Sequence, residues 1–468
     1  MKPRFAWPAA AAASLACLLW PSFWNGFPII FADTGGYLER PFEGTLVMGR
    51  SALYGAFLAA GMRLDFWPCL LVQAALATWI IMLLLRVQGL GHRPALLPLC
   101  AAALGLLTAL PWYVSQLMPD IFIPLSVAAF YILAFHAKDI GRFEAAALVA
   151  TTAFAIASHM ATLALSLALL CGLPLLIAAM RVLPARSRGA TWRISFGGPA
   201  LSIIAGVALA LLSNLAIAGQ FAFTPGGASF LFGRLIQDGI VPRYLAAHCP
   251  DPSIRLCPYR DELPKTADDW LWGNSPFHHL GGDDAYAPEE RRIILATLRL
   301  YPRAHLTTAA KAAFDQFTLF KTTASVTHAH NNFALDALTR YAPDIAPRLH
   351  AARQQQPDGF EIAPPGWPRL RAPVQDNDAF EFVPFNFVHV PVAALAMALL
   401  PVIVVLGLRN RLPRSVAGLA LTVAFALAAN AAISGIFSNP VDRYQSRLIW
   451  LAPFCVLIAV LTRSRRIS

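Results

Sequence analysis

The stretch FEAAALVATTAFAIASHMATLALSLALLCGLPLLIAAM at residues 143–180 is apolar almost throughout, and its one polar interruption is Ser158-His159-Met160. A helix needs about 20 residues to cross the hydrocarbon of a bilayer, so one continuous helix of this length would be far too long. Two short helices that meet in a turn at His159 fit the pattern better. The stretch therefore predicts two membrane crossings with the His159 turn on one side of a membrane.

The composition of the whole chain agrees with a membrane location. Of its 468 residues, 57% are hydrophobic and 13% are charged, and the mean hydropathy is +0.55. A soluble domain carries about twice that charged share, so the composition excludes a soluble enzyme. The apolar runs predict an all-α polytopic membrane protein with about ten transmembrane helices, at 5–26, 66–86, 95–114, 119–136, 144–158, 161–180, 195–218, 387–408, 415–436 and 447–462.

Charge along the chain predicts the orientation of these helices. Lys and Arg gather in the short connections at 86–94, 137–143, 181–194 and 409–414. Cytoplasmic loops carry such an excess, which places both ends of the chain in the cytoplasm and the His159 turn outside. The formal net charge of +11 is thus explained by topology in a cell membrane, inner or plasma, and not by binding of nucleic acid.

The predicted helices divide the chain into three regions: an N-terminal membrane region at 1–218, a large extracytoplasmic segment at 219–386 and a C-terminal membrane region at 387–468. The outer segment is expected to be mostly helical. One amphipathic helix opens at Ala287-Pro288 and ends near Pro302, and another follows from about Thr307 to Phe320. Their basic and apolar faces suit either the membrane surface or packing within the outer segment.

Two of the seven cysteines, Cys249 and Cys257, lie in the outer segment within CPDPSIRLC. The other five fall in predicted membrane helices, where a thiol is a small apolar side chain. A short Pro-braced loop in an oxidising compartment favours a disulfide between Cys249 and Cys257. The alternative is a metal site that includes the adjacent His248.

Two acidic residues follow predicted helices on the outer side, where a charge near hydrocarbon costs several kcal/mol unless it has a partner or a function. Asp33 lies in FADTGGYL at 31–38, and Asp120 lies in SQLMPD at 115–120. Asp33 suits a general base or a cation ligand. The alternative for both carboxylates is an N-terminal helix cap that accepts backbone N–H bonds.

Two basic clusters lie on the same outer face. His159 in the external turn is either a catalytic group or a hydrogen-bonded structural one. Arg443 and Arg447, in NPVDRYQSR at 439–447, are four positions apart and share one helix face, from which they can hold a phosphate. The alternative is an Asp442–Arg443 pair at the interface, with Arg447 snorkelling to the membrane surface.

An acidic residue in the first outer loop, here in ADTGGYL at 32–38, resembles the pattern of the GT-C glycosyltransferases. These polytopic enzymes use polyprenyl-phosphate-linked sugars at the outer face of a membrane. The resemblance extends to the helices after Pro288, with LYPRA at 300–304, and to RYQSR at 443–447. Thr34 follows Asp33, where the family usually has an Asp-Glu pair.

The resemblance implies transfer of a sugar from a polyprenyl-phosphate donor to a lipid, glycan or protein acceptor, with membrane lipids around the protein. Asp33 matches the base that activates the acceptor, which in the family sometimes works with a divalent metal ion. On this hypothesis the catalytic residues are Asp33, Asp120 and His159, and the substrate-binding or phosphate-binding residues are Arg443, Arg447, Tyr37 and Gln445.

Two other functions remain open from the sequence. An O-antigen ligase or polymerase would need essential Arg or His residues in the outer segment, such as His278, His279 or the pair His328 and His330. That pair could also bind a metal ion, but two histidines alone do not define a metal site.

A lipid or solute transporter is the other alternative. Two features that are common in transporters are missing from the sequence: a charged residue deep inside a predicted helix, and an inverted repeat.

Overall fold

The computed structural model describes residues 3–182, 194–323, 332–345 and 380–464. The regular structure of these residues is entirely helical, apart from two isolated β-bridges. Within the same ranges, seven helices are long and apolar enough to cross a membrane: Ala6–Asn25, Trp67–Val87, Met160–Ala178, Gly197–Ala218, Val383–Leu408, Arg414–Phe437 and Asp442–Arg463. The prediction of an all-α multi-pass membrane protein is therefore confirmed at this level.

Three of the ten predicted spans, those at 95–114, 119–136 and 144–158, form helices that are shorter than these seven. The run at 95–114 is broken at Thr108 into α5 (Leu96–Leu107) and α6 (Leu110–Val114). The run at 119–136 forms a single 3-10 turn, η2 (Pro119–Ile121), and then α7 (Phe122–Phe135). Every residue of α7 up to Ala134 is buried, so this helix lies at the centre of the bundle, where neighbouring helices rather than lipid surround it.

The break at His159 divides the stretch 143–180 as predicted. The 17-residue helix α8 (Arg142–Ser158) ends there, and α9 (Met160–Val182) begins at the next residue. The helix α10 (Gly197–Ala218) packs closely on α8, since a Cβ atom at Gly206 would lie only 2.7 Å from Cβ of Ile156. Close packing of α10 against α8 holds the turn in place.

Two short helices that the apolar pattern does not predict lie between α1 (Pro3–Asn25) and α4 (Trp67–Val87). They are α2 (Ala32–Glu43) and α3 (Ala52–Gly61). Gly55 lets them cross in contact, because a Cβ atom there would lie 2.0 Å from the carbonyl oxygen of Tyr37. This crossing orients the start of α2.

The outer segment has its own hydrophobic core, with Phe232, Trp270 and Tyr286 fully buried. Its helices are α11 (Gly227–Gln237), α12 (Ile240–His248), α13 (Ala267–Trp272), α14 (Pro276–His279), α15 (Gly282–Leu300), α16 (Pro302–Thr318) and α17 (Asn332–Tyr341), with a 3-10 turn, η3, at Cys257–Tyr259. The two amphipathic helices predicted here are α15 and α16, and each begins about five residues before its predicted start. Cys249 and Cys257 form a disulfide.

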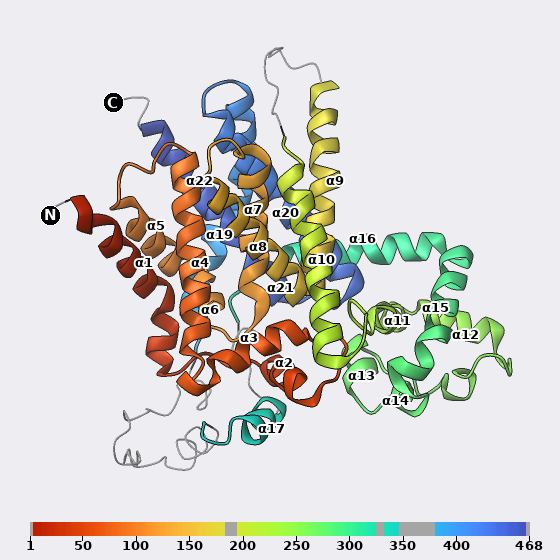
Figure 1. Cartoon of the computed structure of the whole chain (residues 1–468). Coiled ribbons are helices and arrows are strands. Elements are labelled where there is room, and N and C mark those ends of the chain that lie inside the picture. The colour runs from red at the N-terminus through yellow and green to blue at the C-terminus, as the bar shows by residue number, and fades with distance from the viewer. Residues whose placement is uncertain (1–2, 183–193, 324–331, 346–379, 465–468) are drawn as a thin grey trace.

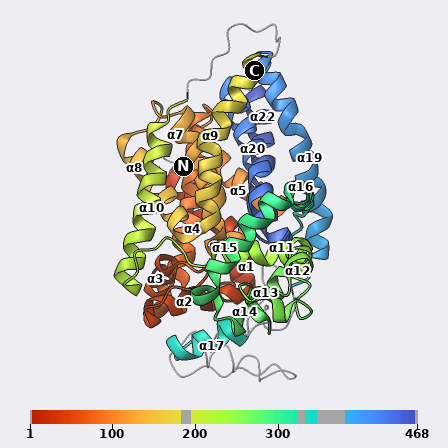
Figure 2. The same ribbon diagram turned by 90° about the vertical axis from the view of Figure 1, so that its right-hand side faces the viewer.

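The last helices are α19 (Val383–Leu408), α20 (Arg414–Phe437), α21 (Asp442–Ile449) and α22 (Leu451–Ser464). The last membrane-spanning helix is predicted at 447–462, but in the structure it begins at Asp442 and includes α21 and α22. Arg443 therefore lies inside this helix, in its first turn. Figure 1 shows α2, α3, α11–α15 and α17 at one end of the bundle, while the α19–α20 connection lies at the other. Figure 2 shows α16 running beside α20, where a Cβ atom at Gly435 would lie 2.4 Å from the carbonyl oxygen of Ala312.

Candidate functional site

Asp33 stands in the first turn of α2 but does not cap the helix. Oγ1 of Thr34 performs that role, because it accepts the backbone N–H of Phe31 at 3.0 Å. The same hydroxyl donates to the carbonyl oxygen of Leu117 at 3.1 Å. The carboxylate of Asp33 is therefore left available for side-chain partners.

The loop before α2 is fixed against the loop that leads to Asp120. Ile29 donates its N–H to the carbonyl oxygen of Ser115 at 2.9 Å and accepts the N–H of Leu117 at 2.9 Å. This pairing is one of the two isolated β-bridges. It brings Asp33 and Asp120 to the same place, although 87 positions separate them in the chain.

Arg50, just before α3, is the closest partner of Asp33. Its Nη2 lies 2.6 Å from Oδ1 of Asp33, and the two side chains are 18% and 22% exposed. Sequence analysis does not single out Arg50, because this residue lies in an irregular connection between two helices, α2 and α3, that the apolar pattern does not predict. The only sequence signal is an arginine beside a glycine in the first outer loop.

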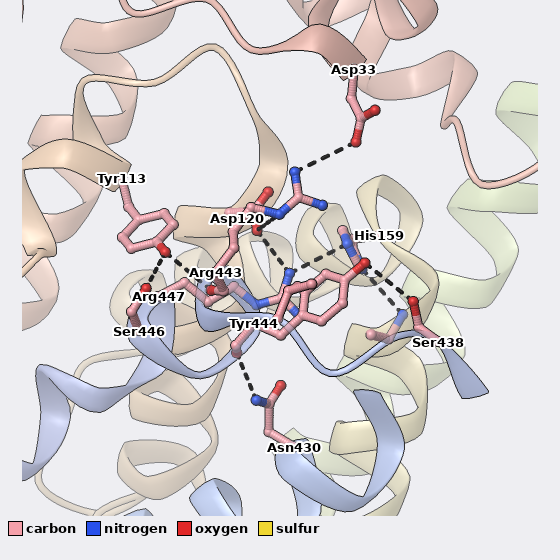
Figure 3. Close-up of polar contacts among 12 residues, drawn as sticks. Asp33, Tyr113, Asp120, His159, Asn430, Ser438, Arg443, Tyr444, Ser446 and Arg447 are labelled. Carbon is pink, nitrogen blue, oxygen red and sulfur yellow. Dashed lines mark hydrogen bonds and ion pairs between the residues drawn. The ribbon is translucent and has the colours of Figure 1, made fainter. Parts of the chain in front are cut away.

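Arg443 and Arg447 project from α21 toward the two carboxylates, as Figure 3 shows. Nη1 of Arg443 lies 3.5 Å from Oδ2 of Asp33, and its Nε lies 3.9 Å from Oδ1 of Asp120. Nη1 of Arg447 donates to Oδ1 of Asp120 at 2.8 Å. The four residues thus form one chain of charges that alternate in sign.

The alternatives that the sequence left open for these residues do not match the geometry. Oδ1 of Asp442 accepts the backbone N–H of Lys321 at 2.7 Å, while Arg443 turns toward Asp33 and Asp120. Arg447 and Asp120 have no exposed side-chain surface, so Arg447 does not snorkel to the membrane surface. Asp120 binds a side chain and does not act as a helix cap.

His159 contacts Arg447, the buried last member of this chain of charges. Its Nε2 lies 3.5 Å from Nη1 of Arg447, and its Nδ1 lies 3.2 Å from the backbone N–H of Ala161. A small cavity of about 30 Å³ lies beside it, lined among others by Arg50, Ser158 and Asn214. This volume holds about two water molecules but no sugar, so the cavity extends the polar site without being a substrate pocket.

Tyr37 and Gln445 lie behind the charged groups. The ring of Tyr37 is 2% exposed, and the guanidinium carbon of Arg50 lies 5.7 Å from its centroid. Burial raises the pKa of Tyr37 above its ordinary range, so the hydroxyl is protonated. Gln445 is fully buried and clamps α21 to α20, through Asn430 at 2.8 Å and the carbonyl oxygen of Leu427 at 3.1 Å. Both residues hold the site in shape.

Further contacts fix the start of α21, and most of them are visible in Figure 3. The hydroxyl of Tyr113 donates to the carbonyl oxygen of Arg443 at 3.0 Å and also contacts Oγ of Ser446. Asn430 donates to the carbonyl oxygen of Tyr444 at 2.8 Å. Gln316 of α16 makes two bonds to the backbone of Val441, at 2.9 and 3.0 Å. The outer segment thereby helps to position Arg443.

The site has an exposed part and an enclosed part. Asp33 and Arg50 are partly exposed, Arg443 is buried with 8% of its surface exposed, and Asp120 and Arg447 are fully enclosed. Oδ2 of Asp120 and both Nε and Nη2 of Arg447 are buried without a hydrogen-bond partner among the described residues. Three guanidinium groups gather around Asp33 and Asp120, and arginines are the side chains that best hold an anion such as a phosphate.

No three His, Cys, Asp or Glu side chains converge within the described ranges as ligands of a metal ion. His278 and His279 in α14 contact Phe277 and Tyr259 of the outer segment, not the Asp33 cluster. His328 and His330 lie outside the described residues. Comparison of the chain with models of protein families, with curated proteins and with solved structures finds no match.

Proposed function

We propose that this protein is a membrane glycosyltransferase of the GT-C type, which transfers a sugar from a polyprenyl-phosphate donor to a lipid, glycan or protein acceptor. One observation carries the proposal. Four chain segments bring Asp33, Arg50, Asp120 and Arg443 together, with Asp33 and Arg50 partly exposed and Arg443 buried directly behind them. Lipid-linked sugar transfer needs a base for the acceptor and cations for the phosphate.

The charges account for each step of the transfer. The acceptor oxygen forms a bond to the anomeric carbon of the donor sugar. The bond from that carbon to the phosphate oxygen breaks, and its electron pair leaves with the phosphate. Arg50 and Arg443 stabilise the departing phosphate, and Asp33 takes the proton of the acceptor hydroxyl. No general acid is needed, because the phosphate leaves as an anion.

The ion pairs of Asp33 explain how one cluster serves both substrates. Without substrate, Asp33 is held between Arg50 at 2.6 Å and Arg443 at 3.5 Å, so both guanidinium groups occupy its carboxylate. A bound phosphate competes for both guanidinium groups and releases the carboxylate. Donor binding therefore activates Asp33, and the enclosed Asp120–Arg447 pair keeps Arg443 in place beneath it.

In this proposal the end of the bundle with α2, α3 and the outer segment faces outward from the cell membrane, and both chain ends are cytoplasmic, as the Lys and Arg bias predicts. The lipid part of the donor then lies in the outer leaflet. The ligase alternative gains no support, because His278 and His279 contact other residues of the outer segment. The transporter alternative gains none either, since α2, which carries Asp33, lies at one end of the bundle (Figure 1).

The test measures transfer of labelled sugar by the purified protein in proteoliposomes. A panel of polyprenyl-phosphate and polyprenyl-diphosphate sugars is offered together with a membrane-lipid extract as a source of acceptors. We expect consumption of one monophosphate donor and loss of that consumption in Asp33→Asn, which keeps the shape of the side chain but cannot take a proton. Asp261→Asn, at an 87% exposed carboxylate of the outer segment, is the matched control. Wild-type turnover by a folded Asp33→Asn variant would contradict the proposal.

A further inference from the structure

The helix α13 of the outer segment reaches the Asp33 cluster. Trp272, its last residue, is 51% exposed, and the guanidinium carbon of Arg50 lies 5.5 Å from the centroid of its ring. The same Arg50 holds Asp33 at 2.6 Å. A large aromatic ring with half of its surface free thus stands directly beside the exposed part of the site.

Asp268 lies one turn before Trp272 and is also exposed. Residues four positions apart on a helix share one face, so both side chains project from the same side of α13. Partial shielding from water raises the pKa of Asp268, a hydrogen bond from Asn439 lowers it, the charges of Asp269 and Asp33 raise it, and Arg443 lowers it. Through Asn439, Asp268 contacts the chain just before α21.

The outer segment holds this face rigidly. Trp270 on the opposite side of α13 is fully buried in the core of the segment. Oγ1 of Thr266 caps the helix by accepting the N–H of Asp269 at 3.0 Å, and Gln237 of α11 accepts the N–H of Ala267 at 2.9 Å. Phe230, also of α11, packs on the edge of Trp272 with ring centroids 6.4 Å apart. An exposed tryptophan that is held in this way is suited to contact a ligand.

We propose that Trp272 and Asp268 form the subsite for the sugar of the donor, a neutral pyranose. This inference rests on the proposed function and adds the place where the sugar binds. One face of a pyranose carries C–H groups that stack on an aromatic ring, and its hydroxyl groups donate hydrogen bonds to a carboxylate. A sugar is joined directly to its phosphate, so a ring stacked on the free surface of Trp272 lies next to a phosphate held by Arg50, whose guanidinium carbon is 5.5 Å from the centroid of Trp272.

The charge of the subsite limits the sugars that it accepts. Asp268 shares a face of α13 with Trp272, so its carboxylate repels a sugar that carries a carboxylate of its own, while Arg50 and Arg443 are engaged by the phosphate of the donor. Neutral sugars can donate their hydroxyl hydrogens to Asp268 instead. The subsite therefore favours a neutral hexose or pentose over a uronic acid.

The test separates binding of the sugar from binding of the phosphate. The dissociation constants of bare polyprenyl phosphate and of the neutral-sugar donors are measured for the full-length protein in detergent. We expect the wild type to bind the preferred sugar donor about fivefold to tenfold more tightly than the bare phosphate, as one aromatic contact provides. Trp272→Ala should remove this difference and leave the affinity for the bare phosphate unchanged, while Trp272→Phe should keep part of it.

Two controls keep the result interpretable. Phe221→Ala removes another exposed aromatic ring of the outer segment, 67% exposed, and should leave the ratio of the two affinities as in the wild type. Asp268→Asn should reduce the difference in dissociation constant between a neutral-sugar donor and a uronic-acid donor. An unchanged ratio in Trp272→Ala would overturn the subsite while the proposed function stands. Failure of both lipids to bind the wild type would overturn the proposed function and the subsite with it.

Discussion

Asp120 and Arg447 form an ion pair with no exposed side-chain surface, and their atoms lie 2.8 Å apart. Breaking such a pair by removing one partner leaves an uncompensated buried charge. We therefore predict that Asp120→Ala lowers the free energy of unfolding by about 3 to 5 kcal/mol. Thermal unfolding of the purified protein in detergent measures the change.

The matched control for Asp120 is Glu144→Ala. Glu144 pairs with Arg86 through two bonds of 2.6 Å, but both side chains are partly exposed. Exposed pairs contribute about 0 to 1 kcal/mol, so this variant should unfold close to the wild type. Equal losses in the two variants would show that burial does not decide the cost, and that the site is not the enclosed arrangement described above.

Single residues were predictable from the sequence only where a charge stands next to an apolar run. Asp33, Asp120, Arg443 and Arg447 met that condition, and the structure brings them together. Their contacts were not predictable, because each partner lies far away in the chain. Arg50, Trp272 and Asp268 were missed, since they lie in irregular or short elements whose place depends on tertiary packing.

At the scale of helices, the contact of α16 with α20 depends on a glycine. A Cβ atom at Gly435 would lie 2.4 Å from a backbone oxygen of α16, and backbone cannot move as cheaply as a side chain. We predict that Gly435→Ala separates the two helices and costs about 1 to 3 kcal/mol of stability. Because Gln316 of α16 holds the backbone before α21, activity should fall as well.

The comparison for Gly435 is Gly197→Ala, at the start of α10. A Cβ atom at Gly197 meets nothing within 4 Å. This change should leave the melting temperature unchanged or raise it slightly, because alanine favours a helix. A Gly435→Ala variant that melts together with Gly197→Ala would contradict the close packing of α16 on α20.

Inside the outer segment, α15 carries a carboxyl group that responds to pH. Burial raises the pKa of Glu290 from 4.5 to about 7, while hydrogen bonds from Ser229 and Trp270 lower it and the charges of Asp283 and Arg291 act in opposite directions. The folded protein binds this proton more tightly than the unfolded chain does. The contribution of Glu290 is therefore fully favourable below about pH 4.5 and is lost as the pH rises to about 7.

We predict that the outer segment loses on the order of 2 kcal/mol of stability over this pH window and that Glu290→Gln removes most of the loss. Hydrogen exchange of α11 and α15 in the full-length protein, recorded on both sides of the window, measures it. Glu262→Gln, at an exposed carboxylate, should keep the wild-type dependence. The same pH dependence in Glu290→Gln would assign the effect to another group.

The order of helices was more predictable than their number. Hydropathy located the seven helices of membrane-spanning length but not the shorter apolar helix at Ala52–Leu64, and the His159 break is where the polar interruption predicts it. Composition does not distinguish a helix inside the bundle from one in lipid, so the runs at 95–114 and 119–136 predict full spans, whereas the structure has shorter helices there. Helices α2 and α3 are not predictable in this way, because α2 carries charged residues that pair with one another and α3 has only ten residues.

At the scale of the whole molecule, the disulfide and the charge bias should agree on one orientation. A disulfide such as Cys249–Cys257 persists in an oxidising compartment, which favours the prediction that the outer segment lies outside the cytoplasm. The Lys and Arg excess independently places the α19–α20 connection inside. The candidate site, at the same end of the bundle as α2 and α3, then faces outward.

We predict that a membrane-impermeant maleimide labels Asp261→Cys in intact cells, whereas Arg409→Cys, in the α19–α20 connection, reacts only after the membrane is opened. Both positions are exposed, so a difference in labelling reports the side of the membrane and not burial. The wild type gives the background from its five unpaired cysteines. The opposite labelling pattern would place Asp33 on the cytoplasmic side, where the disulfide would be reduced, and would contradict a donor bound from the outer leaflet.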